Sequence, residues 1–472
     1  MINRAKVGPW DLLDLLLRAV AVVVAVALAL IATRDISRAW DVWAYHMPFA
    51  ARLAGIVGPA TYEFSPAHAA RFAGFPLLGE TLQGLLWRLT GRPEAANLVA
   101  LGSLYGLVAF LSRVFGAPLH TALLALVAIP LVMIHATAAY VDLLANACVT
   151  MLLLLVWRSL ADRGPGSIGT LVAAACLAAA AVNTKYQLIP IVLMAWLILS
   201  ARALSAPRRG AALAVGAGAL PLILATPVKN TILHRNPIYP VAASLLGKAL
   251  PGAEQPYVAI PIDLREASRP VRFLASAFEV GTLPITSGRR WTIDQWASED
   301  SPAFRMGGLF GAYVALNLVA LSWAMAKRPS RTTLTAGAMV ALAMGVASVM
   351  PQSHEQRYYM FWMLLLVSVN VTIWSPSLPV AAPLVACAAL TIVAWGTRGE
   401  YLYRAPESFE ALVRAEVDTS VVRAAPPGGT ICIAVPQWTF LYAAPFHGKT
   451  YRVQEATRPE DCESGGARPG KQ

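Results

Sequence analysis

Residues 13–33 read LDLLLRAVAVVVAVALALIAT, and their only charges are Asp14 and Arg18. About 20 predominantly apolar residues, wound as an α-helix, are long enough to cross the hydrocarbon core of a bilayer. A helix also satisfies its own backbone hydrogen bonds where no water is present. The stretch therefore predicts a membrane-spanning helix. The two early charges and the lack of a convincing cleavage site favour a retained helix over a cleaved signal peptide.

Apolar stretches of similar length recur along the rest of the chain, so the sequence predicts about eleven spanning helices. The further ten are residues 96–115, 120–139, 142–160, 167–183, 187–204, 210–227, 306–326, 332–350, 357–374 and 380–397.

The composition of the 472-residue chain agrees with a membrane protein. It is 57% hydrophobic and 14% charged, whereas soluble domains carry roughly 25% charged residues. The net charge of +12 could indicate nucleic-acid binding. However, Lys and Arg stand in short clusters between apolar runs instead of forming one basic patch, which excludes that partner.

The basic residues predict an orientation. They fall in alternate short loops, which all lie on the cytoplasmic side if the N-terminus does. An odd number of helices then places the C-terminus outside, in the periplasm of a bacterial inner (plasma) membrane. The residues that set this orientation are Arg4, Lys6, Arg18, Arg113, Arg158, Arg163, Arg202, Arg208, Arg209, Lys327, Arg328 and Arg331.

Three segments are too polar to span, and they complete the predicted architecture. Residues 34–95 and 228–305 form outer loops of an all-α polytopic module, residues 1–397, with interfacial helices in the first loop. Residues 398–472 form a small periplasmic α/β appendage with a helix at 408–423 and a strand at 430–435. Whether Cys432 and Cys462 pair depends on the compartment that holds this tail.

The stretch WDVWAYHMP, residues 40–48, follows the first helix on the outer side. On a helix Asp41 and Tyr45 share a face, and a carboxylate there can act as a general base or orient a hydroxyl nucleophile. The alternative is an aromatic belt at the membrane edge with Asp41 as a helix cap. A lone Asp41 and His46 pair does not predict a metal site.

Later in the first loop, Glu80, Gln83 and Trp87 have helical spacing, which predicts an amphipathic helix on the membrane surface. Glu80 either lines a site or stabilises the helix dipole. Asp142 stands between two spanning segments at the outer boundary, where ionisable residues are costly and usually functional. A simple turn residue is the alternative.

Two cations stand on the outer side, against the positive-inside trend. Lys185, followed by Tyr186, suits a phosphate oxygen as a point charge, or it snorkels to lipid headgroups. Arg357, followed by Tyr358, can bind a phosphate bidentately, or it is an interfacial arginine. With Asp41 and Asp142, these residues suit a reaction that activates an acceptor and stabilises a departing phosphate. We expect them to surround a cavity that opens to the outer leaflet.

These segments, taken in order, resemble the GT-C class of membrane glycosyltransferases, which includes protein O-mannosyltransferases and lipid A aminoarabinose transferases. The resemblance covers most of residues 1–400 and depends on short motifs in a fixed order. These are DVWAYH at 41–46, FPLLGE at 75–80, YVD at 140–142, TKY at 184–186, NPIYP at 236–240 and QRY at 356–358.

The resemblance implies a polyprenyl-phosphate or polyprenyl-diphosphate sugar donor and an inverting displacement. It implies that Asp41 is the base or the acceptor-orienting carboxylate, and that Asp142 assists it or holds a cation. It further implies that Lys185 and Arg357 bind the donor phosphate, with Tyr45, His46, Glu80, Tyr186 and Tyr358 lining the site. Val42 replaces the second acid of the protein O-mannosyltransferases, and the chain has no Asp-x-Asp. Both departures argue against protein mannosylation and strong metal dependence, although a divalent cation stays open.

The sequence thus predicts a membrane glycosyltransferase, hexosyl or pentosyl, whose partners are a lipid-linked donor, membrane lipids and a cell-envelope lipid or glycan acceptor. A secondary transporter for an anionic solute would require broken helices near the midplane and inverted repeats. A scaffold without catalysis would leave the outer-face charges unexplained. A glycan polymerase or ligase is a near variant of the favoured function.

Overall fold

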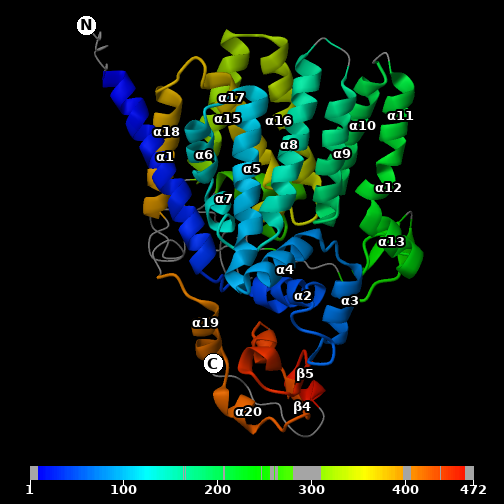
Figure 1. Ribbon diagram of the computed structural model, residues 1–472. Helices are drawn as coiled ribbons and strands as arrows, with labels where there is room; N and C mark the ends of the chain where they lie inside the picture. The colour runs from blue at the N-terminus through cyan, green and yellow to red at the C-terminus, as the bar shows by residue number, and fades with distance from the viewer. Residues whose placement is uncertain are drawn as a thin grey trace.

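The computed structural model describes residues 9–462 except 163, 165, 206–207, 246, 256–259, 261–263, 280–309, 397–404 and 436. The part of the second predicted outer loop from 280 to 305 therefore lies outside the described residues. The remainder is a helical bundle that carries a smaller mixed region at one end (Figure 1).

The bundle is built around α8, which is buried along most of its length and contacts α5, α9, α10, α16 and α17. The helices of the bundle are α1 (Pro9–Arg34), α5 (Leu98–Phe115), α6 (Leu119–Val127), α7 (Pro130–His135), α8 (Asp142–Ala161), α9 (Ile168–Val182), α10 (Ile189–Ala203), α11 (Arg209–Gly218), α12 (Leu220–Ile223), α13 (Ala225–His234), α15 (Phe310–Lys327), α16 (Arg331–Val349), α17 (Phe361–Trp374) and α18 (Ala381–Gly396).

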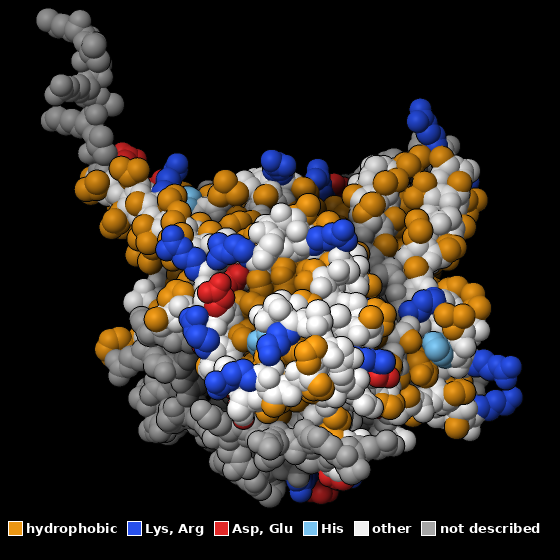
Figure 2. All heavy atoms as spheres, turned by 60° about the horizontal axis from the view of Figure 1, so that its bottom comes forward, with side chains coloured by type: hydrophobic (Ala, Val, Ile, Leu, Met, Phe, Trp, Pro, Cys, Tyr) orange, Lys and Arg blue, Asp and Glu red, His pale blue; other side chains and the backbone are white. Residues whose placement is uncertain are grey.

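The surface of α1 shows why this bundle needs lipid around it. Leu15, Val22 and Val23 are each more than 60% exposed, while Leu17 and Ala21 pack inward. Figure 2 shows the resulting apolar surface on the helix that follows the grey N-terminal trace. A helix that is apolar on its exposed face is stable only in contact with hydrocarbon, as in a membrane span.

The number of predicted spans is supported only in part. Among the described residues, six helices are long and apolar enough to cross a membrane, or seven if one bent pair is a single span. The predicted helix 120–139 is instead two short helices, α6 and α7. They separate at Pro130, which lacks a backbone N–H, and the preceding Ile129 is extended as proline requires of its neighbour.

The predicted helix 210–227 is also interrupted. The helices before and after Leu224 differ in direction by 55°. Asn183 lies at this break, where its Nδ2 donates to Leu222 O at 2.9 Å and its Oδ1 accepts from Thr226 N at 3.0 Å. A side chain inserted into the backbone ladder is a common cause of a sharp bend.

The first outer segment forms short helices that lie across one end of the bundle (Figure 1). They are the π-helix η1 (Val42–His46), α2 (Met47–Leu53), α3 (Pro66–Gly74) and α4 (Leu78–Thr90). Glu80, Gln83 and Trp87 do share one face of α4, as their spacing predicts, but that face is buried against protein. At Gly84 an added Cβ would lie 2.2 Å from Ala50 O, so only glycine lets α2 and α4 pack this closely.

The tail lies beyond these helices, at the end of the bundle opposite the start of α1 (Figure 1). The predicted helix 408–423 is two helices, α19 (Phe409–Glu416) and α20 (Thr419–Ala424), because Asp418 caps a second start by accepting from Ser420 N. Two strands follow, β4 (Thr430–Ile433) and β5 (Arg452–Glu455).

A strand of the first outer segment completes the sheet of the tail. β1 (Tyr62–Glu63) pairs in parallel with β5, which pairs in parallel with β4, so the order is β1-β5-β4. The tail also contacts the first segment through Arg38, whose guanidinium lies 2.6 Å from Glu407 and 2.7 Å from Glu416. These contacts hold the tail against the helices that cover the bundle end.

The second outer segment adds little regular structure to that end. Its described part contains the hairpin β2 (Ala243–Leu245) and β3 (Lys248–Leu250) and the helix α14 (Arg269–Phe278), which packs on α15 and α16. Short 3-10 helices, η2 (Pro93–Asn97), η3 (Tyr186–Leu188), η5 (Gln356–Tyr359), η6 (Thr439–Tyr442), η7 (Ala444–His447) and η8 (Pro459–Asp461), connect the longer elements.

Candidate active site

Asp41 and Arg357 come together from positions far apart in the chain. Arg357 Nη1 donates to Asp41 Oδ2 at 2.8 Å, and the two side chains are only 8% and 17% exposed. Asp41 immediately precedes η1, whereas Arg357 lies in η5, the single turn that leads into α17. Folding therefore joins the carboxylate and the guanidinium that the sequence identified separately.

Asp142 and Lys185 form a second pair beside the first. Lys185 Nζ lies 2.5 Å from Asp142 Oδ1, and the carboxylate of Asp142 is fully buried. Asp142 occupies the first turn of α8, where the partial positive charge of a helix N-terminus favours a carboxylate. Asn146, one turn further along α8, donates to Arg357 O at 3.3 Å and so ties the two pairs together.

The ring of Tyr358 is in contact with both cations. Lys185 Nζ and Arg357 Cζ each lie 4.7 Å from the centre of that ring, within the range of a cation–π contact. Arg357 also donates to the Tyr358 hydroxyl at 3.0 Å. We call Asp41, Asp142, Lys185, Arg357 and Tyr358 the charge cluster. The two carboxylates and the two cations make the charge cluster neutral overall. Both cations contact the same aromatic ring, that of Tyr358.

The π-helical turn η1 brings a further pair to the cluster. Because this turn is wider than an α-helical one, His46 as well as Tyr45 lies one turn after Asp41. His46 Nδ1 is 2.7 Å from Glu80 Oε1, and both side chains are almost wholly buried. The rings of Tyr45 and His46 are in contact, with centres 4.4 Å apart. Single π-helical turns frequently occur at functional sites.

The ion pair with Arg357 sets the protonation of Asp41. Burial raises the pKa of this carboxyl, but the positive charge of Arg357, with smaller contributions from His46 and Lys185, outweighs burial and holds the pKa below its usual range. Burial raises the pKa of the Tyr45 hydroxyl well above its usual value. At neutral pH Asp41 is therefore a carboxylate and Tyr45 a neutral hydroxyl.

Tyr186 does not join the charge cluster, although Lys185 precedes it. Its hydroxyl donates to Gly74 O and to Tyr239 O, the latter at 3.1 Å, and it accepts from Asn230 Nδ2 at 2.5 Å. These bonds connect η3, α3 and α13. The position of Tyr186 is accounted for by this junction, which fixes the segment that carries Lys185.

Three residues that sequence reasoning did not single out lie at the site. Tyr140 contacts His46 at 5.6 Å and Arg357 at 5.4 Å, Arg71 lies 5.8 Å from the ring of Tyr45, and Glu355 Oε2 lies 3.6 Å from Arg357 Nε. Tyr140 is inside a motif already quoted, Glu355 is next to one and Arg71 lies four residues before one, so proximity in sequence was the available signal. A tyrosine or a second acid beside a motif is too common to be selected on that signal.

The carboxylates of the cluster are not arranged as metal ligands. Asp41 faces Arg357 and Asp142 faces Lys185, so each acid already has a cation partner. Within the ranges that the structure describes, no group of three or more His, Cys, Asp or Glu side chains is placed to hold a metal ion. The donor set therefore does not fit a resident divalent cation, and we derive no step through one.

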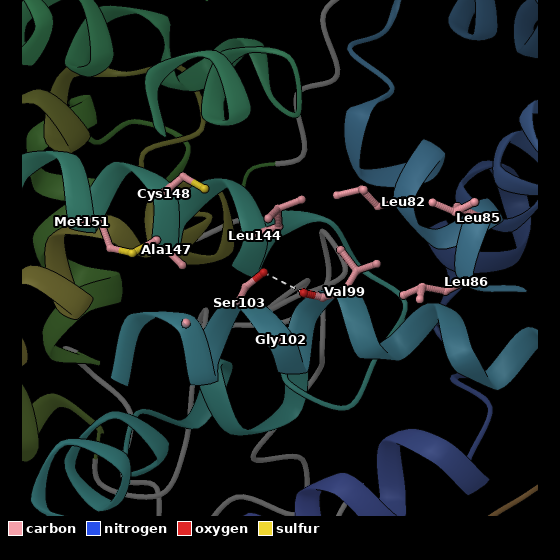
Figure 3. A pocket seen from close by; sticks show the side chains of 11 residues that line it. Leu82, Leu85, Leu86, Val99, Gly102, Ser103, Leu144, Ala147, Cys148 and Met151 are labelled. Carbon is pink, nitrogen blue, oxygen red and sulfur yellow. Dashed lines mark hydrogen bonds between the residues drawn. The ribbon is translucent and has the colours of Figure 1, made fainter. Parts of the chain in front are cut away.

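An apolar groove of about 370 Å³ lies between α4, α5 and α8 (Figure 3). Leu82 and Leu85 line one side and Leu144 and Met151 another. The residues of α8 in this groove are on the opposite side of that helix from Asp142 and Asn146, which face the charge cluster. The groove is thus lined mainly by apolar side chains and is not part of the charge cluster.

Comparison with solved structures relates this arrangement to a known fold. The crystal structure of ArnT from Cupriavidus metallidurans bound to undecaprenyl phosphate matches 93% of this chain and 85% of its own, with 14% identity and a TM-score of 0.52. The apo structure of the same protein matches over the same shares, with 14% identity and a TM-score of 0.50. The chain has the fold of ArnT.

ArnT is a lipid A aminoarabinose transferase of the GT-C class, so the resemblance drawn from the short motifs is confirmed at the level of the fold. At 14% identity the match does not extend to the activity or the residue roles. No family model matches the chain, and neither does any curated protein. The ArnT fold places the chain among multi-pass membrane proteins, and the function must be argued from the site.

Proposed function

We propose that the chain is a membrane glycosyltransferase that moves a sugar from a polyprenyl-phosphate or polyprenyl-diphosphate donor to a cell-envelope lipid or glycan acceptor. The observation that carries the proposal is that Lys185 and Arg357 both contact the ring of Tyr358 and that each lies beside a carboxylate. ArnT, which has the same fold, is the protein crystallised with undecaprenyl phosphate.

The proposed reaction is an inverting displacement at the anomeric carbon. Arg357 and Lys185 bind the phosphate and stabilise the negative charge that develops on it as the sugar–oxygen bond breaks. Asp41 serves as base or as the carboxylate that orients the acceptor. Asp142 holds Lys185 at its position. A buried, largely desolvated cluster strengthens each of these charge interactions.

Broken helices are a feature of many transporters, so the bent helix pair could favour the transporter alternative. There, unwound backbone groups coordinate the transported ion. Here the break at Leu224 is occupied by Asn183, whose amide both donates to and accepts from the backbone on its two sides. These backbone groups are already bonded within the chain, which favours the transferase.

A donor-turnover assay tests the proposal. Purified protein in a cell-envelope lipid extract, which supplies acceptor hydroxyls, is given labelled undecaprenyl-phosphate or undecaprenyl-diphosphate sugars. Release of the polyprenyl phosphate or diphosphate is followed. We expect the wild type to consume one of these donors and Asp41→Asn to lower kcat by about 10²–10⁴-fold, the range for losing a positioned acid–base group. The matched control is Asp14→Asn, which breaks the exposed Asp14–Arg18 pair and should leave turnover unchanged. Equal turnover by wild type and Asp41→Asn would remove Asp41 from the reaction.

We also propose that the charge cluster and the tail face the periplasm. Basic loops touch one another at the far end of the bundle, where Arg202 reaches Ser159 O and Arg331 reaches Leu160 O. Clustered basic loops are typical of the cytoplasmic side. An oxidising compartment for the tail also fits Cys432 and Cys462, which are joined as a disulfide in the structure.

Thiol labelling checks this orientation. We expect Cys432 and Cys462 of the protein taken from cells to react with a maleimide only after reduction. Cys432→Ser should lower the free energy of unfolding of the tail by roughly 3–4 kcal/mol, as expected for a bridge that spans 30 residues. Limited proteolysis measures that loss, with Cys387→Ser, which removes an unbridged thiol, as control. Labelling of both cysteines without a reductant would contradict a periplasmic tail.

A further inference from the structure

Glycosyl transfer requires a group that accepts a proton from the acceptor hydroxyl as its oxygen attacks, and Asp41 is poorly suited to that role. The ideal base has a pKa near the working pH. Arg357 bonds directly to Asp41 Oδ2 and holds the pKa of that carboxyl low, which makes it a weak base. Asp41 can still orient a hydroxyl, because an ionised carboxylate is a strong hydrogen-bond acceptor.

His46 has the features that Asp41 lacks. Its Nδ1 faces Glu80 Oε1 at 2.7 Å. A carboxylate accepts hydrogen bonds, so an ionised Glu80 selects the tautomer in which Nδ1 carries the hydrogen. Nε2 is then the unprotonated nitrogen. Nε2 makes no hydrogen bond with the part of the chain that the structure describes. It is also not fully buried, because it is absent from the fully buried polar atoms that lack a partner.

This arrangement is the carboxylate–histidine pair that general-base catalysis uses elsewhere. The carboxylate fixes the tautomer and stabilises the imidazolium that forms when Nε2 takes a proton. Histidine normally changes its charge between pH 5 and 8, which suits a base near neutrality. Both side chains lie beside the charge cluster, because the His46 ring contacts Tyr140, which in turn contacts Arg357.

We propose that His46, oriented by Glu80, is the general base of the transfer and that Asp41 only orients the acceptor. This rests on the glycosyltransferase function proposed above. The acceptor hydroxyl oxygen bonds to the anomeric carbon, and the bond from that carbon to the phosphate oxygen breaks, leaving its electron pair on the phosphate. The hydroxyl proton passes to His46 Nε2, and the imidazolium later releases it to water or to the departing phosphate.

The test is the pH dependence of kcat/KM for donor consumption in the presence of acceptor. The groups facing His46 are Glu80 from α4, Tyr140 before α8, and Asp41 and Tyr45 from its own segment, with Arg357 behind Tyr140. Histidine is the side-chain type among these whose ordinary pKa lies closest to neutrality. A general base must be unprotonated to accept the hydroxyl proton, so we expect wild-type activity to fall as the pH is lowered.

The variants separate a base from a merely structural histidine. We call the fall of activity at low pH the acid limb of the profile. We expect His46→Gln to lower kcat by about 10²–10⁴-fold and also to remove the acid limb, leaving a residual rate that is flat from pH 5 to 8. Glu80→Gln should keep the limb but displace it to lower pH, because the imidazolium loses its negative partner. The double variant should be no slower than His46→Gln, since the two residues act as one unit.

A second buried His–Glu pair in the same region gives the matched control. His68 Nδ1 lies 2.5 Å from Glu455 Oε1, and this pair joins α3 to β5 away from the charge cluster. We expect His68→Gln to lower thermal stability while leaving the acid limb in place.

The outcomes distinguish this inference from the function on which it rests. A wild type that, with acceptor present, consumes neither polyprenyl-phosphate nor polyprenyl-diphosphate sugars at any pH ends the proposed function. A wild type that turns over, with His46→Gln at full rate or with its acid limb intact, ends only the assignment of His46. If His46→Gln does not fold, Glu80→Gln decides, because a profile identical to wild type removes the pair from the proton transfer.

Discussion

Arg357→Gln is expected to lower kcat/KM for donor consumption by at least about 10³-fold, the upper part of the range for losing one preorganised charge-stabilising group. Arg357 would lose its bond to Asp41 Oδ2, its bond to the Tyr358 hydroxyl and its contacts with the rings of Tyr358 and Tyr140. No other guanidinium bonds Asp41 among the described residues, so the acceptor-orienting carboxylate and the phosphate site fail together.

The same substitution also affects stability. It leaves Asp41 largely buried without its cation, and breaking a buried pair from one side costs roughly 3–5 kcal/mol. Arg357→Lys keeps the charge but not the planar fork that reaches two partners, so we expect it to recover most of the stability and little of the rate.

Kinetics together with unfolding in a denaturing detergent measure these effects. The control is Arg38→Lys, which alters an exposed arginine that also bonds two partners, Glu407 and Glu416. It should change stability by no more than about 1 kcal/mol, as exposed pairs do, and leave the rate unchanged. Wild-type kinetics for Arg357→Gln would show that this residue does not bind the donor phosphate.

The second large effect concerns Asp142 and Lys185. Asp142→Asn alone leaves the Lys185 ammonium, which is 12% exposed, without its carboxylate, and Lys185→Met alone leaves a fully buried carboxylate. Each is expected to destabilise the protein by roughly 3–5 kcal/mol, whereas the double variant should cost much less than the sum, because neither charge is then buried alone.

Activity separates the structural role of this pair from its catalytic role. We expect the double variant to fold and still lose donor turnover, because the cation that binds the phosphate is absent. The measurement is a double-mutant cycle of unfolding free energy beside donor turnover for the same four proteins. Additive destabilisation would mean that the pair does not interact in the folded protein. Wild-type turnover by the double variant would exclude Lys185 from phosphate binding.

Much of the fold follows from hydropathy, and the failures have local causes. The stretches at 13–33 and 142–160 form helices close to their predicted bounds. The stretch 120–139 does not form one helix, because Pro130 breaks it, and 210–227 bends where Asn183 enters the ladder. Proline can be recognised in the sequence, but a distant asparagine side chain cannot be assigned to a break before the helices are packed.

In the candidate site, too, some features could be predicted from the sequence and others depend on how the helices pack. Four charged residues on the predicted outer side were identifiable one at a time, because each opposes the tendency of its surroundings: Asp41, Asp142, Lys185 and Arg357. Which acid faces which cation was not identifiable, because the partners are 43 and 316 residues apart in the chain. The resemblance implied that His46 lines the site, but the π-helical turn that places it one turn after Asp41 could not be identified, since α-helical spacing gives that position to Tyr45 alone.

The sequence by itself determined that this is a membrane protein. A chain with 14% charged residues and repeated apolar runs has too few polar side chains to cover its whole surface in water. It also predicts on which side of the membrane the four site charges lie, because clusters of basic residues are typical of the cytoplasmic side. Only the tertiary structure decided that Lys185 and Arg357 share the ring of Tyr358, and that Glu80 orients His46. Hydropathy acts along the chain, whereas ion pairs and ring contacts depend on distances that exist only after the helices pack.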